Sequence, residues 1–300
     1  MSPILQTIQL SKRFGKTLVL NQMELSVPEG SVYGLLGPNG AGKSTTLQIL
    51  MNLQQPSSGR AEIFGHDSRR ISPQDFTRIG YVAESQETPN WMTVGSFMAY
   101  LQPFYPNWDT SLAEQLLYQF DLPLDRGLRH LSRGMGMKLL LAASLAFRPR
   151  LLLMDEPFSA LDPLTRDELI EGLLANAEDV SILIASHDVN EIESFASHIG
   201  YLERGRLQFS EEMASLAQRF REVEVTGAHE FGRLRSNLPA SWLNTEQCGS
   251  LVRFIETQFE QERTICEIRR LFQNASQIAV RAMPLRSIFV TLAKASRKAA

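Results

Sequence analysis

Cysteine and long apolar runs are both scarce in this sequence. Its 300 residues include two cysteines, Cys248 and Cys266, whose separation matches no metal-ligand spacing and no disulfide framework. We therefore expect both to be packing residues of a protein from a reducing compartment. The longest apolar run, Leu139 to Phe147, is much shorter than the ~18 residues of a membrane-spanning helix. The N-terminus has no basic region followed by an apolar one, so we expect no secretion signal, and any work at a membrane would need another, spanning chain.

The sequence also lacks a strong charge of either sign. Its formal charge of −3 comes from 30 Lys and Arg against 33 Asp and Glu, which argues against general binding to nucleic acid. It has no internal repeat and no low-complexity tract. A length of 300 residues predicts two domains.

One motif carries most of the chemical information. Residues 37–44 read Gly-Pro-Asn-Gly-Ala-Gly-Lys-Ser, a complete G-x-x-x-x-G-K-[ST] phosphate-binding loop. Its glycines allow the tight turns that point backbone N–H groups at phosphate oxygens. Lys43 is suited to reach the β- and γ-phosphates, and the Ser44 hydroxyl is suited to ligate Mg²⁺. The predicted ATP-binding residues of this loop are Gly37, Pro38, Asn39, Gly40, Ala41, Gly42, Lys43, Ser44 and Thr45.

The flanking segments favour a nucleotide site over a glycine-rich turn with a chance lysine. Val32 to Leu36 predicts a short buried strand that enters the loop. Ser44 to Leu53 predicts a helix whose N-terminus faces the phosphates. The chain is therefore predicted to bind a nucleoside triphosphate.

A second motif, Leu151 to Pro157, reads Leu-Leu-Leu-Met-Asp-Glu-Pro. A buried strand that ends in Asp155 and Glu156 would place the first carboxylate beside a Mg²⁺ bound at Ser44. Glu156 would then lie where it can polarise the water that attacks the γ-phosphate. Acidic residues also commonly end a strand without any catalytic role, but the phosphate loop upstream favours the functional interpretation.

Outside the motifs, the first 210 residues alternate strand and helix patterns, as α/β proteins do. Leu151 to Asp155 and Ser181 to Ser186 are continuous apolar runs, which suit parallel strands buried on both faces. Periodic leucines predict that residues 93–146 are mostly helical. Leu202 to Leu207 contains a Glu-Arg-Gly-Arg turn that we expect to close the first domain.

From residue 211 the pattern changes, and we predict a separate small α+β domain. Arg221 to Val225 and Leu251 to Ile255 alternate like exposed strands. Glu260 to Phe272 and Leu285 to Lys294 have the pattern of amphipathic helices.

Further motifs resemble those of the ATP-binding cassette (ABC) ATPases. Leu131 to Met135 reads Leu-Ser-Arg-Gly-Met and resembles the Leu-Ser-Gly-Gly-Gln signature that distinguishes this family from other phosphate-loop enzymes. Ser159 to Asp162 resembles the loop after the catalytic carboxylate, and His187 resembles the family's switch histidine. Ile79 to Glu84 resembles the strand that leads to the loop sensing Mg²⁺ and the transport partner.

The resemblance covers residues 4–210 and implies a fold. Residues 1–210 would form an α/β phosphate-loop ABC ATPase domain with a mixed-sheet core and a helical subdomain at 93–146, and residues 211–300 a small C-terminal α+β accessory domain. It also implies a mechanism in which two cassettes, as a homodimer or a paralogous heterodimer, sandwich ATP between one phosphate loop and the partner's signature.

Particular residues take roles from this resemblance. Ser132 and Gly134 would bind the γ-phosphate of the partner's ATP, and His187 would hydrogen-bond the γ-phosphate and orient the water. Phe14 would stack on the adenine, although an aromatic residue at this position could equally belong to the surface or the core. The catalytic pair would be Glu156 and His187.

Two positions depart from the family's usual pattern. Glu84 stands where a glutamine is usual; a carboxylate can still bind Mg²⁺ or water, and Gln86 is the alternative. The predicted metal residues are Ser44, Glu84 and Asp155. Arg133 replaces a glycine of the signature. Both departures, together with Phe104 to Asp109, resemble a bacterial subgroup associated with export.

The most aromatic stretch is residues 85–108, which in the family receives a short helix of the membrane subunit. Trp91 and Met92 are predicted to make this contact, while most of the other apolar side chains could instead form the core of the helical subdomain.

The leading hypothesis is the ATP-hydrolysing subunit of an ABC transporter that powers transport, with export favoured, through separate integral membrane permease subunits. It would lie in the cytoplasm at the inner face of the cell membrane, and nucleic acid is not expected as a partner. A soluble ABC ATPase that acts on ribosomes or nucleic acid is the alternative; such proteins usually carry two cassettes or a long inserted coiled coil, and this chain has neither. Intact Lys43, Glu156 and His187 argue against a module that binds ATP without hydrolysing it.

Overall fold

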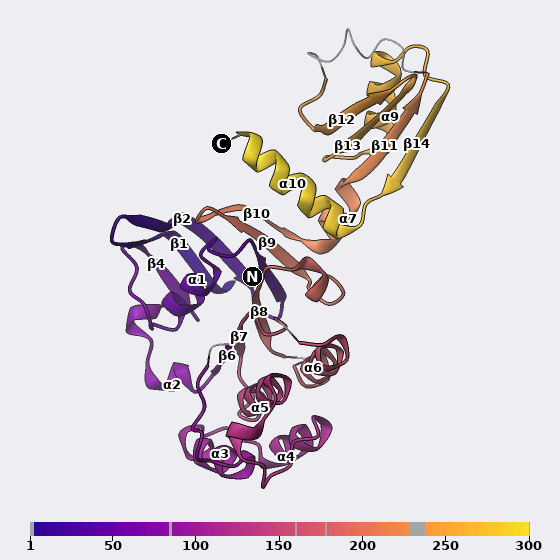
Figure 1. The fold of residues 1–300 in the computed structure, drawn as a ribbon. Coiled ribbons are helices and arrows are strands. Elements are labelled where there is room, and N and C mark those ends of the chain that lie inside the picture. Colours follow the sequence, from indigo (N-terminus) through magenta and orange to yellow (C-terminus); the bar gives the residue numbers. More distant parts are fainter. Residues whose placement is uncertain (1–2, 84–85, 160, 178, 228–237, 300) are drawn as a thin grey trace. The chain divides into compact units, whose positions relative to one another are not determined.

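The computed structural model describes residues 3–83, 86–159, 161–177, 179–227 and 238–299. The chain divides into two compact units, which we call unit 1 (Met1–Ser210) and unit 2 (Glu211–Ala300). Figure 1 shows strands and helices in each unit.

The centre of unit 1 is a six-stranded sheet in the order β10-β9-β3-β8-β7-β6. Its strands are β3 (Val32–Leu36), β6 (Ile79–Ala83), β7 (Leu151–Asp155), β8 (Ser181–Ser186), β9 (His198–Glu203) and β10 (Arg206–Glu212). The pairs from β9 through to β6 are parallel. Every residue of β7 and β8 is buried, as expected for parallel strands covered on both faces. The carboxyl ends of parallel strands meet at one edge, so the ends of β3, β7 and β8 lie together there.

A second, four-stranded sheet of unit 1 has the order β2-β1-β4-β5. Its strands are β1 (Pro3–Phe14), β2 (Thr17–Pro28), β4 (Ser58–Ile63) and β5 (His66–Asp67), paired antiparallel. Leu5 and Leu25 of this sheet share one buried cluster with Leu35 and Leu153 of the six-stranded sheet. The common core fixes the two sheets as one body, and the α/β fold class predicted from the sequence is confirmed.

The helices of unit 1 are α1 (Lys43–Leu50), α2 (Pro73–Phe76), α3 (Val94–Leu101), α4 (Thr110–Gln119), α5 (Arg133–Leu145) and α6 (Pro163–Asn176). The prediction that residues 93–146 are mostly helical is confirmed by α3, α4 and α5, which lie together in Figure 1. The prediction that the first helix extends to Leu53 was wrong. That helix ends at Leu50 because Asn52 adopts a positive φ of 56°, which no α-helix continues.

Unit 2 contains a sheet in the order β12-β13-β11-β14 and three described helices. The strands are β11 (Arg221–Thr226), β12 (Trp242–Cys248), β13 (Leu251–Glu256) and β14 (Gln277–Ala282), all paired antiparallel. The helices are α7 (Met213–Arg219), α9 (Gln261–Leu271) and α10 (Leu285–Ala299).

The core of unit 2 lies between one face of this sheet and α9. Val223, Val225 and Phe254 pack with Ile268, and Trp242 stacks on Phe254 with 3.8 Å between ring centroids. The expectation of exposed strands at 221–225 and 251–255 was therefore wrong, because alternate side chains of β11 and β13 are fully buried. Period-2 alternation marks one buried face as well as one exposed face.

In the described part of the chain, no helix combines the length and the apolar character that crossing a bilayer requires.

Candidate active site

The predicted phosphate loop joins the end of β3 to the start of α1. The Gly37 N–H donates to the Ser186 carbonyl over 3.3 Å, and the Ala41 N–H donates to the Pro38 carbonyl over 3.1 Å. The loop is thus tied to β8 and turns back on itself. Gly42 is the N-cap of α1, with no side-chain capping hydrogen bond and no acidic residue in the first turn. The first N–H groups of α1 are therefore suited to receive an anion.

Gly42 occupies a position that no other residue fits. Its φ of 110° lies in the region that L side chains rarely adopt, and a β-carbon there would lie 2.5 Å from Leu20 Cδ2. The tip of the loop, at Asn39 and Gly40, is exposed, while Thr45 is half-buried in α1. The loop therefore has a fixed, buried base and an accessible tip.

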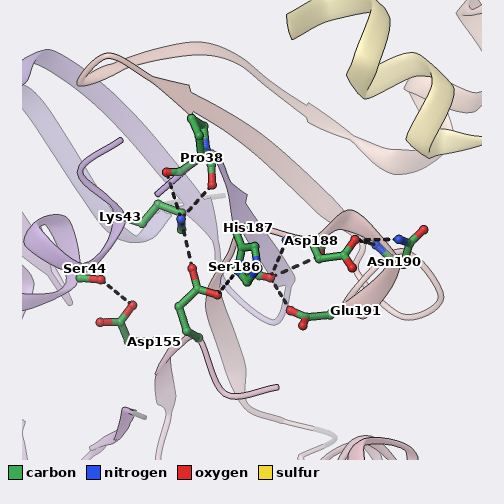
Figure 2. A network of polar contacts seen from close by, with 11 residues as sticks. Pro38, Lys43, Ser44, Asp155, Ser186, His187, Asp188, Asn190 and Glu191 are labelled. Carbon is green, nitrogen blue, oxygen red and sulfur yellow. Dashed lines mark hydrogen bonds and ion pairs between the residues drawn. The ribbon is translucent and has the colours of Figure 1, made fainter. Parts of the chain in front are cut away.

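Lys43 is the buried cation of the loop, with 5% of its side chain exposed. Its Nζ donates to the Gly37 carbonyl over 2.8 Å and to the Pro38 carbonyl over 3.3 Å. The same Nζ lies 3.1 Å from Oε1 of Glu156. Lys43 thus points back over its own loop toward the end of β7, as Figure 2 shows.

Ser44 and Asp155 meet across the site. The Ser44 hydroxyl donates to Oδ1 of Asp155 over 2.9 Å, joining α1 to the last residue of β7. Burial raises the pKa of the Asp155 carboxyl and the charge of Glu156 adds to this rise, whereas the hydrogen bond from Ser44 and the charge of Lys43 oppose it. A cation placed at these oxygens would favour the ionised carboxylate.

These two oxygens fit a Mg²⁺ ion, which is commonly held by one or two carboxylates together with substrate phosphates. The described residues hold no group of three or more His, Cys, Asp or Glu side chains that could bind a metal ion by themselves. Ser44 and Asp155 would therefore hold Mg²⁺ in company with the nucleotide, which the ion would help to neutralise.

Glu156 stands at the centre of the site. Its φ of 50° is unusual for a residue with a side chain, and its N–H donates to the Ala185 carbonyl of β8 over 2.9 Å. One carboxylate oxygen faces Lys43, and the other, Oε2, lies 2.8 Å from Nδ1 of His187. Strained backbone of this kind collects at functional sites, where the surrounding structure holds it. The structure thus brings together five predicted residues: Lys43, Ser44, Asp155, Glu156 and His187.

Beneath His187 lies a buried pair that the sequence analysis missed. The Ser186 hydroxyl donates to Oε2 of Glu191 over 2.5 Å and accepts the Asp188 N–H over 3.1 Å (Figure 2). Burial raises the pKa of the Glu191 carboxyl, and the Ser186 hydrogen bond opposes this rise. The pair fixes the turn that carries His187. A glutamate four residues after a histidine gives no sequence signal of burial, so only the packing reveals it.

The predicted signature residues begin a different element. Ser132 is the N-cap of α5, and its Oγ accepts the Met135 N–H over 3.2 Å. Gly134 lies in the first turn of α5. Figure 1 shows α5 beside α3 and α4, whereas α1 lies beside β2 and β4. Ser132 hydrogen-bonds within the start of α5, and Lys43 hydrogen-bonds within the phosphate loop.

Three further predictions concern side chains outside this cluster. Phe14 is 45% exposed, and the Lys12 ammonium lies 4.7 Å from the centre of its ring. Glu84 lies outside the described residues, and Oε1 of the alternative residue, Gln86, accepts the Ala83 N–H over 3.4 Å. Their assigned roles stay predictions.

The aromatic stretch divides into core and surface. Phe97 is buried in α3, and Tyr105 stacks on Phe147 with 3.9 Å between ring centroids. Trp91, in contrast, is 82% exposed. Met92 is half-buried, and its carbonyl accepts the Leu128 N–H over 2.9 Å. An exposed tryptophan on a fixed turn is compatible with the predicted partner contact.

Comparison with known proteins identifies several that this chain resembles. The family model described as ABC transporter matches residues 20–159. The ABC transporter ATP-binding protein YtrB of Bacillus subtilis is 30% identical over 219 residues, which cover 72% of this chain and 75% of that protein. The Nod factor export ATP-binding protein I of Cupriavidus metallidurans is 33% identical over 214 residues, which cover 69% of this chain and 70% of that protein.

Among solved structures, the ATP-binding subunit of an ABC transporter superposes with a TM-score of 0.65 and 26% identity. The match covers 72% of this chain and 92% of that chain. The residues matched by the family model, 20–159, include the phosphate loop and lie within unit 1.

Proposed function

This chain belongs to the ATP-binding proteins of ABC transporters, and we propose that it hydrolyses ATP at the cluster of Lys43, Glu156 and His187 to drive export through separate membrane-spanning subunits. The observation that carries the proposal is the double contact of Glu156. One oxygen of its carboxylate lies 3.1 Å from the loop lysine and the other lies 2.8 Å from the histidine at the end of β8.

ATP binding begins at the phosphate loop. The first N–H groups of α1 and the Lys43 ammonium would hold the β- and γ-phosphates. To do so, Lys43 exchanges its contacts with the Gly37 carbonyl and Glu156 for phosphate oxygens. Because the triphosphate carries more negative charge than the Glu156 carboxylate and the Gly37 carbonyl together, this exchange favours the bound nucleotide.

Glu156 then acts on the attacking water. With Lys43 on the phosphates, the carboxylate is free to accept a proton from water while the water oxygen bonds to the γ-phosphorus. The bond from the γ-phosphorus to the bridging oxygen breaks, and ADP and phosphate leave. His187 keeps Glu156 oriented through the 2.8 Å contact and offers its other ring nitrogen to the γ-phosphate.

The sandwich dimer completes the site in this proposal. Ser132 and Gly134 begin α5, where unpaired N–H groups of a helix N-terminus suit a γ-phosphate. The resemblance to ABC ATPases assigns these two residues to the ATP of a partner cassette. Each partner would therefore supply half of each site, as a homodimer or as a paralogous heterodimer.

Export is proposed for two reasons. The signature contains Arg133 and the position after Ala83 is Glu84, as in the export-associated subgroup that the sequence resembles. One of the relatives is also named as an exporter of Nod factor. A location at the inner face of the cell membrane, with Trp91 and Met92 against a permease subunit, follows from the same proposal. Unit 2 would be an accessory domain.

The experiment that tests this function uses the full chain, tagged and captured from detergent-solubilised membranes of its native host. We expect a membrane protein with several predicted spans to co-purify in a fixed stoichiometry and to raise ATP turnover when both are placed in liposomes. The double variant W91A/M92A should reduce this recovery, and Y118A, which alters another exposed aromatic residue of the helical subdomain, is the matched control. Recovery with ribosomes or nucleic acid alone would contradict the transporter and support the soluble alternative.

A further inference from the structure

The N-terminal turns of α5 and α6 are in direct contact. A β-carbon on Gly134 would lie 2.6 Å from Cγ2 of Thr165 and 3.6 Å from its Cβ and Oγ1. Real β-carbons do not approach other carbons this closely, so the Thr165 methyl group occupies the place that a side chain at residue 134 would need. Gly134 has no positive φ, so its backbone conformation would accept alanine. The close packing against Thr165 alone therefore excludes a side chain at this position.

The Thr165 side chain is itself held in one orientation. Its Oγ1 donates to Oδ2 of Asp162 over 2.6 Å, and its N–H donates to Oδ1 of the same carboxylate over 3.0 Å. Asp162 is the N-cap of α6 and follows Glu156 by six positions in the chain. With χ1 fixed by this hydrogen bond, the methyl group is directed at α5.

Two more contacts lie along the same face of α6. Lys138 Nζ of α5 lies 2.5 Å from Oε2 of Glu168, and Phe120 at the end of α4 packs so closely on Gly172 that a β-carbon there would lie 2.4 Å from its ring. Residues 165, 168 and 172 are spaced by three and four positions, which places them on one face of a helix. This face of α6 therefore supports α4 and α5, and Thr165 is its contact nearest to the signature.

We propose that Thr165 is a positioning residue, whose methyl group seats the Ser132–Gly134 turn on α6 and so sets where the signature presents its hydroxyl and N–H groups to the partner's ATP. The inference rests on the proposed role of the signature in the sandwich. The proposed contact gives a second reason why residue 134 is a glycine: it must leave room for Thr165 as well as for a phosphate.

A double-mutant cycle separates these two reasons. G134A introduces the clash, and T165S removes Cγ2 while keeping the hydroxyl that binds Asp162. G134A/T165S exchanges one methyl group for another across the contact, which cores tolerate well. T165V is the matched control, because it retains a methyl group at the contact and loses the hydroxyl.

We expect G134A to lower kcat/KM for ATP by about tenfold or more, in line with the usual cost of overpacking. G134A/T165S should recover to within about threefold of T165S, whereas G134A/T165V should recover nothing. The dissociation constant of ATP for the single chain should not change, because the phosphate loop lies on other elements. One thermal unfolding transition should have a midpoint that ADP raises. We expect this midpoint to fall in G134A and to return to the value of T165S in G134A/T165S.

Each outcome has a definite meaning. Additive midpoints across the cycle would overturn the packing contact. A midpoint restored by T165S without recovery of kcat/KM would overturn the positioning role and leave phosphate contact as the reason for the glycine. Full kcat/KM in G134A despite a lowered midpoint would contradict the role proposed for the signature, and with it the inference. A failure of the proposed function elsewhere would show separately, as an absence of ATP-driven dimers in the E156Q chain.

Discussion

Lys43 and Glu156 form an ion pair, with 3.1 Å between Nζ and Oε1. The side chain that we propose to bind the triphosphate is thus the partner of the side chain that we propose to activate water. A nucleotide that draws Lys43 to its phosphates leaves Glu156 with His187 alone, at 2.8 Å. Binding and the freeing of the catalytic carboxylate are therefore one event, and the predictions below examine its parts.

Removing the positive charge of Lys43 should weaken the binding of ATP. We expect K43A to reduce ATP affinity by at least about tenfold, the scale of a lost hydrogen bond between charged groups. Isothermal titration calorimetry with ATP measures this directly. K16A, which removes an exposed lysine near the start of the chain, is the control and should bind ATP as the parent does. Equal affinities for the two variants would contradict the role of the loop.

The shape of the loop should depend on Gly42, because a side chain there would be strained by the backbone conformation and crowded by Leu20. G42A combines a φ of 110° with a β-carbon 2.5 Å from Leu20 Cδ2, so we expect it to cost about 1–3 kcal/mol of stability and to lose ATP binding. G136A is the matched control, since that glycine lies inside α5 with no atom within 4 Å of a built β-carbon. It should be neutral or slightly stabilising. Urea unfolding of both variants, with and without ADP, tests the difference, and a G42A chain as stable as G136A would refute this account.

The buried Glu191 should make stability depend on pH. Burial raises the pKa of its carboxyl above the usual 4.5, so the folded chain holds this proton more tightly than the unfolded chain does. The stabilisation from this group is complete below pH 4.5 and is lost as the pH rises through the folded pKa. E191Q keeps an oxygen acceptor for the Ser186 hydroxyl and has no charge to bury.

We therefore expect the unfolding free energy of the parent, measured relative to E191Q, to decrease as the pH rises from 4.5 toward neutrality. E193Q, which alters an exposed neighbouring carboxylate, serves as the control and should follow the parent at each pH. Urea titrations at several pH values give the comparison. A constant difference between the parent and E191Q would show that Glu191 ionises alike in both states.

Much of the site could be predicted from the sequence because its determinants are local. The phosphate loop needs its glycines and lysine at fixed spacing, and β7 and β8 are continuous apolar runs, so both are legible in short windows. The structure also brings Asp155 to Ser44, which parallel strands ending at one edge make possible.

The rest depends on contacts between distant segments or on backbone geometry. The packing of Thr165 on Gly134 joins two helices whose positions no local pattern specifies. The end of α1 at Leu50 depends on the positive φ of Asn52, which residue identity alone does not dictate. In unit 2, alternation showed that the strands have two faces but not that α9 covers one of them.

The most direct test of the whole account is the oligomeric state of E156Q with ATP. The amide cannot take the proton of the attacking water, so we expect turnover to fall by at least about 10²-fold. ATP binding should persist or tighten, since the Glu156 carboxylate no longer competes with the phosphates for Lys43. ATP that stays unhydrolysed should hold two cassettes together. Light scattering on a size-exclusion column should then show a dimer with saturating ATP and Mg²⁺ and a monomer with ADP. A monomer under both conditions, in a chain that calorimetry shows to bind ATP, would contradict the sandwich and the function built on it.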